Sequence, residues 1–262
     1  MDAFKLKWIA IIGMILNHMV IAWWEIIPVW LAIPLYAAGG LTFPIMAYFI
    51  VEGYRHTSNI KKYLLRLFIF GAISFPFHAL TFGIIGLNIM FTMIVGIFSM
   101  MLYDKIKMRP LFWVIFVIIS LLTSFPIFFD WAIVGVVVIL LSHIIRSESK
   151  RRIIPAFVSA AFMLVFTLFS LWSLDNPYAD LGGIVDLGGL PEVYVDRTLL
   201  LVSLAFPIGC VIAAVFLKNF SGERGKRMKW LFYAFYPLHL VLLGLVALAL
   251  GFADLSIFGI GN

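Results

Sequence analysis

The chain has 262 residues, of which 64% are hydrophobic and only 12% are charged, and its formal net charge is +6. Soluble domains are about half apolar and about a quarter charged, so this composition excludes an ordinary soluble globule and predicts an integral membrane protein. The single cysteine, Cys210, excludes an internal disulfide and argues against a thiolate metal site.

Apolar segments recur along the whole chain. A membrane-spanning helix needs about 20 mostly apolar residues. The segments that approach this length cover about 5–24, 30–52, 63–81, 86–103, 110–127, 131–146, 153–172, 198–217 and 229–250. Very short connections around Gly83–Gly86 and Pro126–Asp130 indicate tight hairpins or partly re-entrant segments. We therefore predict an all-α, polytopic transmembrane bundle of about nine spans that forms one domain over residues 1–262.

The basic residues predict the orientation of this bundle. If the N-terminus is cytoplasmic, all but Arg197 of the 19 lysine and arginine residues fall on the inner side. Membrane proteins keep positive charge on the cytoplasmic side, so the net charge needs no nucleic-acid partner. The first apolar segment has no clear cleavage pattern, and we expect it to be an uncleaved anchor.

One predicted outer loop, residues 173–196, differs from the rest of the chain. It contains glycine and proline turn signals and five acidic residues: Asp175, Asp180, Asp186, Glu192 and Asp196. The loop is either a solvated connector or an acidic lid that attracts a cationic acceptor.

Two histidines lie within predicted spans, where an ionisable group is costly and often marks a site. His18 occurs in "LNHMVIAWWE" and His239 in "FYAFYPLHL". At 1.5 Å per residue they are about 20 and about 15 Å from the inner ends of their helices. Pro237 predicts a kink, and the spacing of Tyr233, Tyr236 and His239 places these three side chains on one helix face. Because neutral histidine is a common general base near pH 7, His18 and His239 are candidate catalytic residues.

The other polar positions allow two interpretations each. Asn17, next to His18, either lines the edge of a cavity or faces another neighbour. Glu52 is either a third catalytic group or an interfacial carboxylate beside Arg55. Asn88 and Asp130, at predicted outer helix starts, either line a cavity or cap their helices. The candidate cavity-lining residues are Asn17, Asn88, Asp130, Tyr233 and Tyr236.

The sequence contains no GxSxG, HExxH or P-loop motif and no cysteine near a histidine. This argues against a covalent hydrolase or a metalloprotease, and we expect no metal. A histidine base without a nucleophile fits direct transfer, in which the base deprotonates an acceptor that attacks an activated donor.

Several stretches resemble the TraX family. They are "DAFKLKWIAIIGMILNHM" at 2–19, "FPIMAYFIVEGYRHTSNIKKYLLRLFIFGAISFPF" at 43–77, "NIMFTMIVG" at 88–96 and "KWLFYAFYPLHL" at 229–240. Residues 105–228 are similar mainly in hydropathy, with "FDWAIVG" at 129–135 as a weaker match. TraX proteins are multi-pass membrane proteins linked to N-terminal acetylation of conjugative pilin, and they are similar to the broader membrane acyltransferases.

The resemblance implies acetyl-CoA, or another acyl-CoA, as co-substrate in a bacterial inner membrane, and it places His18, Glu52, Asn88 and His239 on motif positions. The phosphates of such a donor cannot enter hydrocarbon cheaply, so basic residues of the inner face are candidate ligands for them. These residues are Arg55, Lys61, Lys62, Arg66, Lys226, Arg227 and Lys229.

Three functions remain open from the sequence. The first is transfer of an acetyl or similar short acyl group to a peptide, a pilin-like protein or a small amine or hydroxyl acceptor. The second is a proton-coupled transporter with His18, Glu52 and His239 as a relay, although no inverted repeat supports it. The third is a non-catalytic assembly protein for a surface apparatus.

Overall fold

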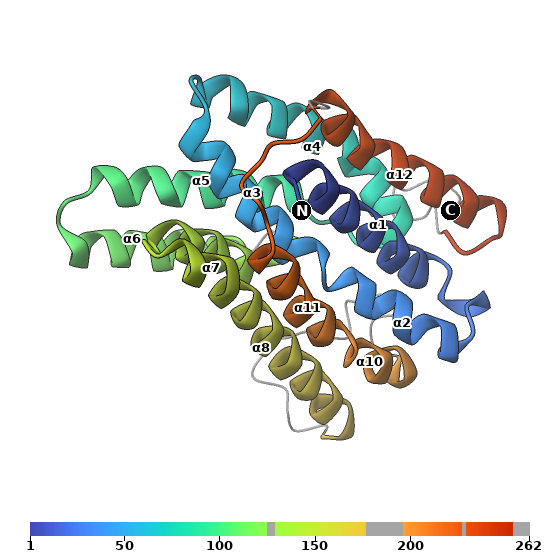
Figure 1. Cartoon of the computed structure of the whole chain (residues 1–262). Helices are drawn as coiled ribbons and strands as arrows, with labels where there is room; N and C mark the ends of the chain where they lie inside the picture. The colour runs from blue at the N-terminus through green and yellow to red at the C-terminus, as the bar shows by residue number, and fades with distance from the viewer. Residues whose placement is uncertain (125–128, 177–195, 227–228, 254–262) are drawn as a thin grey trace.

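A computed structural model describes residues 1–124, 129–176, 196–226 and 229–253 (Figure 1). Apart from one isolated bridge between Leu87 and Phe129, the described residues form helices and connections only, which confirms the all-α prediction. A short 3₁₀ helix, η1, covers Trp24–Ile26. The α-helices are α1 Ala3–Ala22, α2 Val29–Gly39, α3 Thr42–His56, α4 Ile60–Phe82, α5 Ile89–Lys105, α6 Arg109–Leu122, α7 Ala132–Ile144, α8 Glu148–Asp175, α10 Arg197–Ser203, α11 Phe206–Lys218 and α12 Lys229–Ala249.

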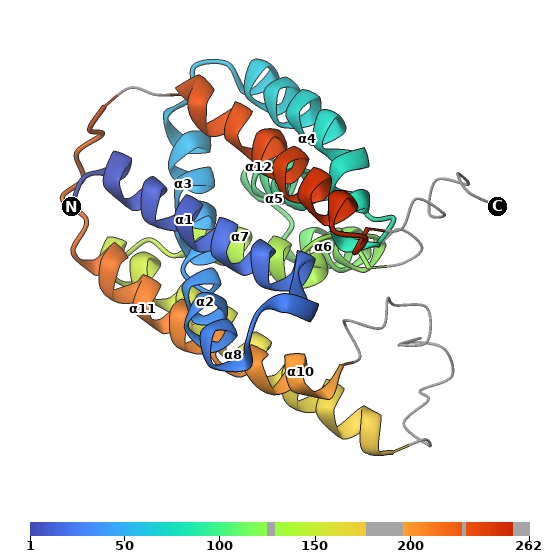
Figure 2. The ribbon, with the colours of Figure 1, turned by 90° about the vertical axis from the view of Figure 1, so that its right-hand side faces the viewer.

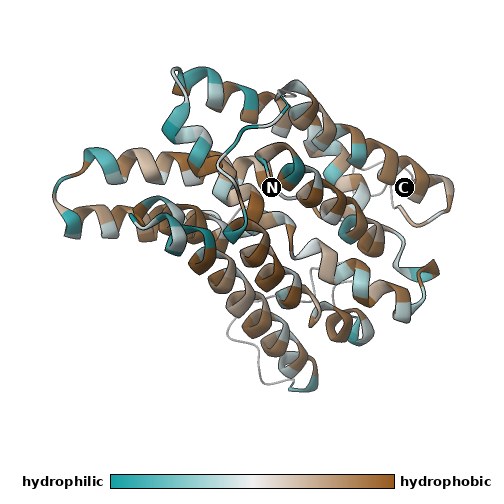
Figure 3. Ribbon diagram, viewed as in Figure 1, coloured by the Kyte–Doolittle hydropathy of each residue, from teal (hydrophilic) through white to brown (hydrophobic). Residues whose placement is uncertain are grey.

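The helices have the length and surface of a membrane protein. Long apolar helical segments cover Ala3–Ala22, Val29–His56, Ile60–Phe82, Glu148–Asp175, Arg197–Lys218 and Trp230–Ala249, which makes six candidate spans among the described residues. Large apolar side chains point outward, such as Val117 on α6 and Val165 on α8, which are 53% and 64% exposed. Hydrophilic colour gathers at the α3–α4 and α5–α6 connections (Figure 3). Such an apolar surface is typical of a protein that is embedded in lipid.

Three predicted spans are shorter than expected. Helices α5, α6 and α7 have 17, 14 and 13 residues. At 1.5 Å per residue they are about 26, 21 and 20 Å long, against a hydrocarbon core of about 30 Å. Helix α6 stops at Leu122, where Thr123 forms the C-cap, although the sequence predicted helix to about residue 127. Helix length therefore supports six of the predicted spans among the described residues, and the total of about nine spans and the orientation of the N-terminus stay predictions.

Two other predicted spans are broken helices whose breaks meet. The segment 30–52 divides into α2 and α3 at Gly40–Leu41, and 198–217 divides into α10 and α11 at Leu204–Ala205. A Cβ atom on Gly40 would lie 2.1 Å from the carbonyl oxygen of Phe206, and one on Gly209 would lie 1.8 Å from that of Ala37. Only glycine permits this approach of the two backbones. Irregular backbone at this depth is tolerated where protein buries it or a cavity adjoins it.

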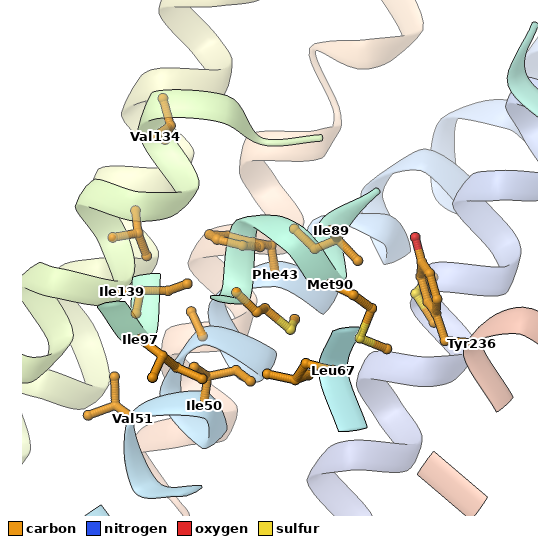
Figure 4. Close-up of a cluster of buried hydrophobic side chains, with 14 of the residues drawn as sticks. Phe43, Ile50, Val51, Leu67, Ile89, Met90, Ile97, Val134, Ile139 and Tyr236 are labelled. Atoms are coloured by element: carbon orange, nitrogen blue, oxygen red, sulfur yellow. The ribbon is translucent and has the colours of Figure 1, made fainter. Parts of the chain in front are cut away.

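Helix α1 occupies the centre of the bundle and positions the site. It lies between α12 and α2 (Figure 2), and α12 packs in turn along α4. The largest core cluster joins side chains of α3, α4, α5, α7 and α12 (Figure 4). Tyr236 lies at one edge of this cluster, with its hydroxyl directed away from the aliphatic side chains. The first and last helices of the chain are thereby held side by side.

Candidate functional site

The structure brings the two candidate catalytic histidines together. Nδ1 of His18 on α1 lies 3.0 Å from Nε2 of His239 on α12, and the two rings are nearly parallel. Phe235 stacks on His239 with ring centroids 5.2 Å apart, and Phe82 and His18 meet edge-to-face with ring centroids 4.9 Å apart. His239 is only 5% exposed. The contacts fix both imidazoles in a single arrangement.

The hydrogen bonds determine which nitrogen of each neutral ring carries the proton. Nδ1 of His239 lies 3.1 Å from the carbonyl oxygen of Phe235. A carbonyl only accepts, so Nδ1 of His239 is protonated and its Nε2 is an acceptor. Nδ1 of His18 must then donate to that Nε2, which leaves Nε2 of His18 with a free lone pair. The Phe235 carbonyl thus makes His18 the proton acceptor of the pair.

A cavity of about 70 Å³ lies against His18. Its wall comes from α1, the α2–α3 break, the start of α5, Asp130 and Trp131, Phe206 at the start of α11, and α12. One water needs about 10–15 Å³ by this kind of measure, so the cavity has room for several waters or for a small acyl group. The breaks in the two helix pairs therefore adjoin a cavity, which accounts for their irregular backbone. The polar wall side chains are Asn17, His18, Thr42, Asp130 and Tyr236.

Asn17 lines the same cavity as His18, although adjacent helical residues point about 100° apart. Its side chain packs directly on Gly39, where a Cβ atom would come within 2.5–2.7 Å of it. The side-chain oxygen is buried and has no hydrogen-bond partner among the described residues. Gly39 therefore provides the space that Asn17 occupies, and the amide remains available to a ligand.

Tyr236 forms another polar part of the wall. Its side chain is 2% exposed, and its ring meets His239 edge-on with centroids 5.4 Å apart. The hydroxyl has no hydrogen bond of good geometry within the described part of the chain, although the Ile89 amide lies close by. A buried hydroxyl without a firm partner is a donor that a ligand can use.

Asp130 is held at the cavity by an unusual backbone. Its amide donates to Leu87 at 2.8 Å, and its carbonyl accepts from the hydroxyl of Thr92. The next residue, Trp131, has φ 62° and stacks on Phe43 with centroids 3.9 Å apart. Positive φ at a residue other than glycine is uncommon and often occurs at functional sites. Helix α7 has no side-chain cap, so Asp130 lines the cavity and does not serve as the N-cap.

Burial changes the chemistry of this carboxyl group. Asp130 precedes α7 and lies outside the helices. Desolvation raises its pKa from 3.8 to about 6, and a hydrogen bond from the Trp131 amide opposes part of that rise. A carboxyl group with such a pKa can accept and release a proton near neutral pH.

Two predicted cavity residues lie elsewhere. Asn88 is the N-cap of α5: its oxygen accepts from the Met90 amide at 3.1 Å, and its nitrogen donates to Gly71 at 2.8 Å. Tyr233 stacks on Phe70 at 5.5 Å and is absent from the described cavity wall. The three side chains Tyr233, Tyr236 and His239 were predicted to share one helix face. In the structure Tyr236 contacts His239, whereas Tyr233 points toward α4. The structure favours the capping interpretation of Asn88.

Glu52 lies at the other end of α3 from the cavity. Its Oε1 is 2.9 Å from Arg151 and 3.9 Å from Arg55. It is six residues beyond Met46, the last wall residue of α3, which is about 9 Å along the helix. The structure therefore places Glu52 as an ion-pair partner at the predicted inner end and not beside the histidines.

The predicted phosphate ligands differ in their surroundings. Arg55 pairs with Glu52 and donates to the His143 carbonyl at 2.9 Å, whereas Arg66 lies over the rings of Tyr63 and Tyr233. Lys61 and Lys62 at the start of α4, and Lys226 before α12, are exposed. The starts of these two helices lie near each other (Figure 2). Lys229 begins α12, its side chain is not described, and Arg227 lies outside the described residues.

Of the predicted acidic loop, only the two ends are described. Asp175 pairs with Arg197 at 2.6 Å, and Asp196 caps α10 by accepting from the Leu199 amide at 2.7 Å. Residues 177–195, with Asp180, Asp186 and Glu192, lie outside the described residues. Neither interpretation of the loop is therefore tested.

Sequence reasoning missed several residues of the site. The rings of Phe43, Trp131 and Phe206 form part of its wall, and Phe232 lines it as well. The ammonium group of Lys7 lies 5.2 Å from the centroid of the Phe232 ring. From the sequence, Lys7 served only to predict the orientation of the chain in the membrane. The weak match at "FDWAIVG" was the available signal for Trp131. Apolar composition hides the other three, because every span is rich in phenylalanine.

Comparison with known proteins gives two matches. The family model described as "TraX protein" matches residues 3–247. The chain is 28% identical over 256 residues to the "Probable fimbrial assembly protein FimC, serogroup H1" of Dichelobacter nodosus, and the alignment covers 92% of this chain and 94% of that protein. No solved structure matches.

Proposed function

The chain belongs to the TraX family, and on that premise we propose that it is a membrane acyltransferase that moves a short acyl group from acyl-CoA to an amine or hydroxyl acceptor. One observation carries the proposal. His239 and the Phe235 carbonyl leave Nε2 of His18 as a proton acceptor, on the wall of a cavity with room for a small acyl group. This is the arrangement that direct transfer needs, and it requires no covalent intermediate on the protein.

The polar wall residues take complementary roles in the transfer. Nε2 of His18 removes a proton from the acceptor as the acceptor nitrogen or oxygen attacks the thioester carbonyl carbon. The carbon–sulfur bond then breaks, and the proton on His18 passes to the departing thiolate. His239 keeps its hydrogen bond to Nδ1 of His18 and stabilises the imidazolium that forms in between. The Tyr236 hydroxyl is a donor for the negative charge that develops on the carbonyl oxygen. Oδ1 of Asn17, which has no partner among the described residues, can accept a hydrogen bond from the attacking group of the acceptor.

The donor enters, in this proposal, from the end of the bundle that is rich in basic residues. Lys7 and Arg66 flank the first turns of α12, where they lie over the rings of Phe232 and Tyr233. These cations and the exposed lysines nearby bind the phosphates, and only the acyl end reaches the cavity. A volume of about 70 Å³ favours an acetyl or similarly short group.

The relative's name supports a protein acceptor. Because FimC is named a probable fimbrial assembly protein, we infer that the acceptor is a subunit of a surface filament and that the protein acts in the inner membrane of a bacterium. The same name favours a second candidate, a purely structural role in filament assembly. A strain with His18→Asn separates the two: assembly without subunit acylation supports the enzyme, and unchanged acylation supports the structural role.

Donor binding tests the proposal directly. The purified full chain in detergent is unfolded thermally with and without acetyl-CoA, because a ligand that binds the folded state raises the midpoint. We expect a rise, and a smaller rise in a Lys7→Ala, Arg66→Ala double variant. Lys107→Ala, which removes an exposed lysine at the α5–α6 connection, is the matched control. An unchanged midpoint at saturating acetyl-CoA would contradict the proposed donor.

A further inference from the structure

The cavity wall combines one acidic side chain with several aromatic rings. Among the described wall residues, Asp130 is the sole carboxylate, and there is no lysine or arginine. No ion pair joins Asp130 to a basic residue in the described part of the chain. A carboxylate that is shielded from water and has no ion-pair partner is unfavourable unless it binds a proton or a cation. A ligand with a positive charge can therefore supply the ion-pair partner that Asp130 lacks.

The rings beside Asp130 suit the same kind of ligand. Trp131 stacks on Phe43 with ring centroids 3.9 Å apart and lies 6.0 Å from Phe206, and all three rings line the cavity together with Asp130. The face of an aromatic ring attracts a cation, and an ammonium ion is attracted to ring and carboxylate together. Asp130 also lies near enough to Tyr236 for its charge to act on that hydroxyl, and Tyr236 contacts His239. The carboxylate and the histidine pair thus border one small space.

We propose that Asp130, with the rings of Phe43, Trp131 and Phe206, binds the ammonium group of the acceptor and selects a primary amine over a hydroxyl. This inference rests on the proposed acyl transfer and names the group that recognises the acceptor. Asp130 is in this sense the specificity-determining residue of the site.

The proton balance of the reaction supports the assignment. An ammonium acceptor must lose two protons to become an amide, whereas a hydroxyl acceptor loses one. The cavity wall holds two proton acceptors, the Asp130 carboxylate and Nε2 of His18. The ammonium group gives its first proton to Asp130, and the free amine then attacks the thioester carbon. The second proton passes to Nε2 of His18 and then to the departing thiolate, and Asp130 returns its proton to water. A hydroxyl substrate would leave Asp130 without a role.

The test measures binding and needs no donor. Two radiolabelled probes of equal shape are used: alanyl-phenylalanine amide, with a free amine, and its analogue with a hydroxyl in place of the amine. Their affinities for the purified full chain in detergent are measured by equilibrium dialysis at pH 7.5. We expect the amine to bind wild type at least about tenfold more tightly, because a bond to a charged group is stronger than a neutral one. Asp130→Asn should abolish this preference and leave the affinity for the hydroxyl probe within about twofold.

Controls separate this inference from the acyl transfer. Glu25→Gln removes one exposed acidic charge outside the cavity and should keep the preference. Equal affinities of the two probes for wild type would overturn the role of Asp130, even if His18-dependent transfer is observed. A preference that survives Asp130→Asn would assign recognition to another group. If Asp130→Asn does not fold, the two probes are compared on wild type at pH 7.5 and at pH 5, and an amine preference that is unchanged at pH 5 would overturn the role of Asp130.

Discussion

His18 and His239 are 221 positions apart in the sequence, and their ring nitrogens are 3.0 Å apart in the structure. The pair exists because α1 and α12 pack side by side, so the two ends of the chain form one site. The Phe235 carbonyl accepts a hydrogen bond from Nδ1 of His239, so the proton of that ring is on Nδ1. Nε2 of His239 then accepts a hydrogen bond from Nδ1 of His18, which leaves Nε2 of His18 free to act as a base.

The first prediction concerns the role of His239 as a positioning residue. His239→Gln keeps an oxygen that can accept the proton of His18 Nδ1, whereas His239→Leu has no acceptor. We expect the transfer rate to fall by roughly 10²-fold in His239→Leu and by less than roughly tenfold in His239→Gln. Steady-state rates of both variants, with thermal midpoints as a check on folding, measure the difference. Equal losses would show that the residue acts through packing alone.

The second prediction concerns Gly39. Gly39→Ala places a Cβ atom 2.5 Å from Asn17 and forces that side chain toward the cavity, which becomes smaller. We expect transfer from propionyl-CoA to fall more than transfer from acetyl-CoA. The ratio of kcat/KM for the two donors measures this effect. Gly244→Ala is the control, because its Cβ would meet Thr81 at 3.0 Å, outside the cavity, and should leave the ratio unchanged.

The third prediction concerns pH. Since burial raises the pKa of Asp130 to about 6, the carboxylate is charged at pH 7.5 and mostly neutral at pH 5. The preference for the amine probe over the hydroxyl probe should therefore disappear as the pH falls through about 6. His18, His239, His78 and Tyr236 are the other titratable groups in or beside the cavity. The pH dependence that remains in Asp130→Asn measures their share, and a dependence identical to wild type would exclude Asp130.

The same pKa makes a prediction about stability. A folded-state pKa of about 6, above the ordinary 3.8, means that ionisation of Asp130 costs stability. The neutral Asp130 carboxyl group therefore makes its full contribution to the free energy of unfolding below about pH 4. That contribution should be lost as the pH rises through about 6. Asp130→Asn should therefore raise the thermal midpoint at pH 8 and not at pH 4. A variant with a lower midpoint at pH 8 would show that the carboxylate stabilises the fold.

The fifth prediction concerns orientation. In a Cys210→Ser background, a membrane-impermeant maleimide should label Glu25→Cys in intact cells and should not label Lys61→Cys until the membrane is opened. Both positions are exposed, and they lie at opposite ends of the predicted topology. The reverse pattern would place the N-terminus outside and would invert the predicted inner face.

The sequence predicted the helices well where an apolar run is continuous, as in α1, α4 and α12. It did not predict the division of α2 from α3 or of α10 from α11, because both runs are apolar throughout. The signals were present as Pro44 and Pro207, which lie in the first turns of the second helices. Proline favours such a position. The contact of Gly40 with Phe206 that fixes the breaks depends on tertiary packing, which no local pattern contains.

The sequence predicted only part of the site, because it gives the depth of a residue along a helix but not the direction of its side chain. Depth along a helix can be counted, so His18 and His239 could be placed at similar levels. Helix rotation and neighbours cannot be counted in this way. Asn88 therefore proved to be a cap that also bonds to Gly71, and Glu52 proved to pair with Arg151. Trp131 adopts a left-handed backbone that its residue type does not suggest, and its ring packs against Phe43, a contact that no local pattern contains.

In the proposed reaction, His18 is the base in acyl transfer from acyl-CoA. The most direct test reconstitutes the full chain in liposomes with [¹⁴C]acetyl-CoA and alanyl-phenylalanine amide and measures the labelled peptide for wild type and His18→Asn. Asparagine has a similar size and can still bond to His239, but it cannot act as a base. We expect acetylation by wild type and a rate on the order of 10²–10⁴-fold lower for a folded, monodisperse His18→Asn protein. Transfer by that variant at the wild-type rate would contradict the role of His18 as the base.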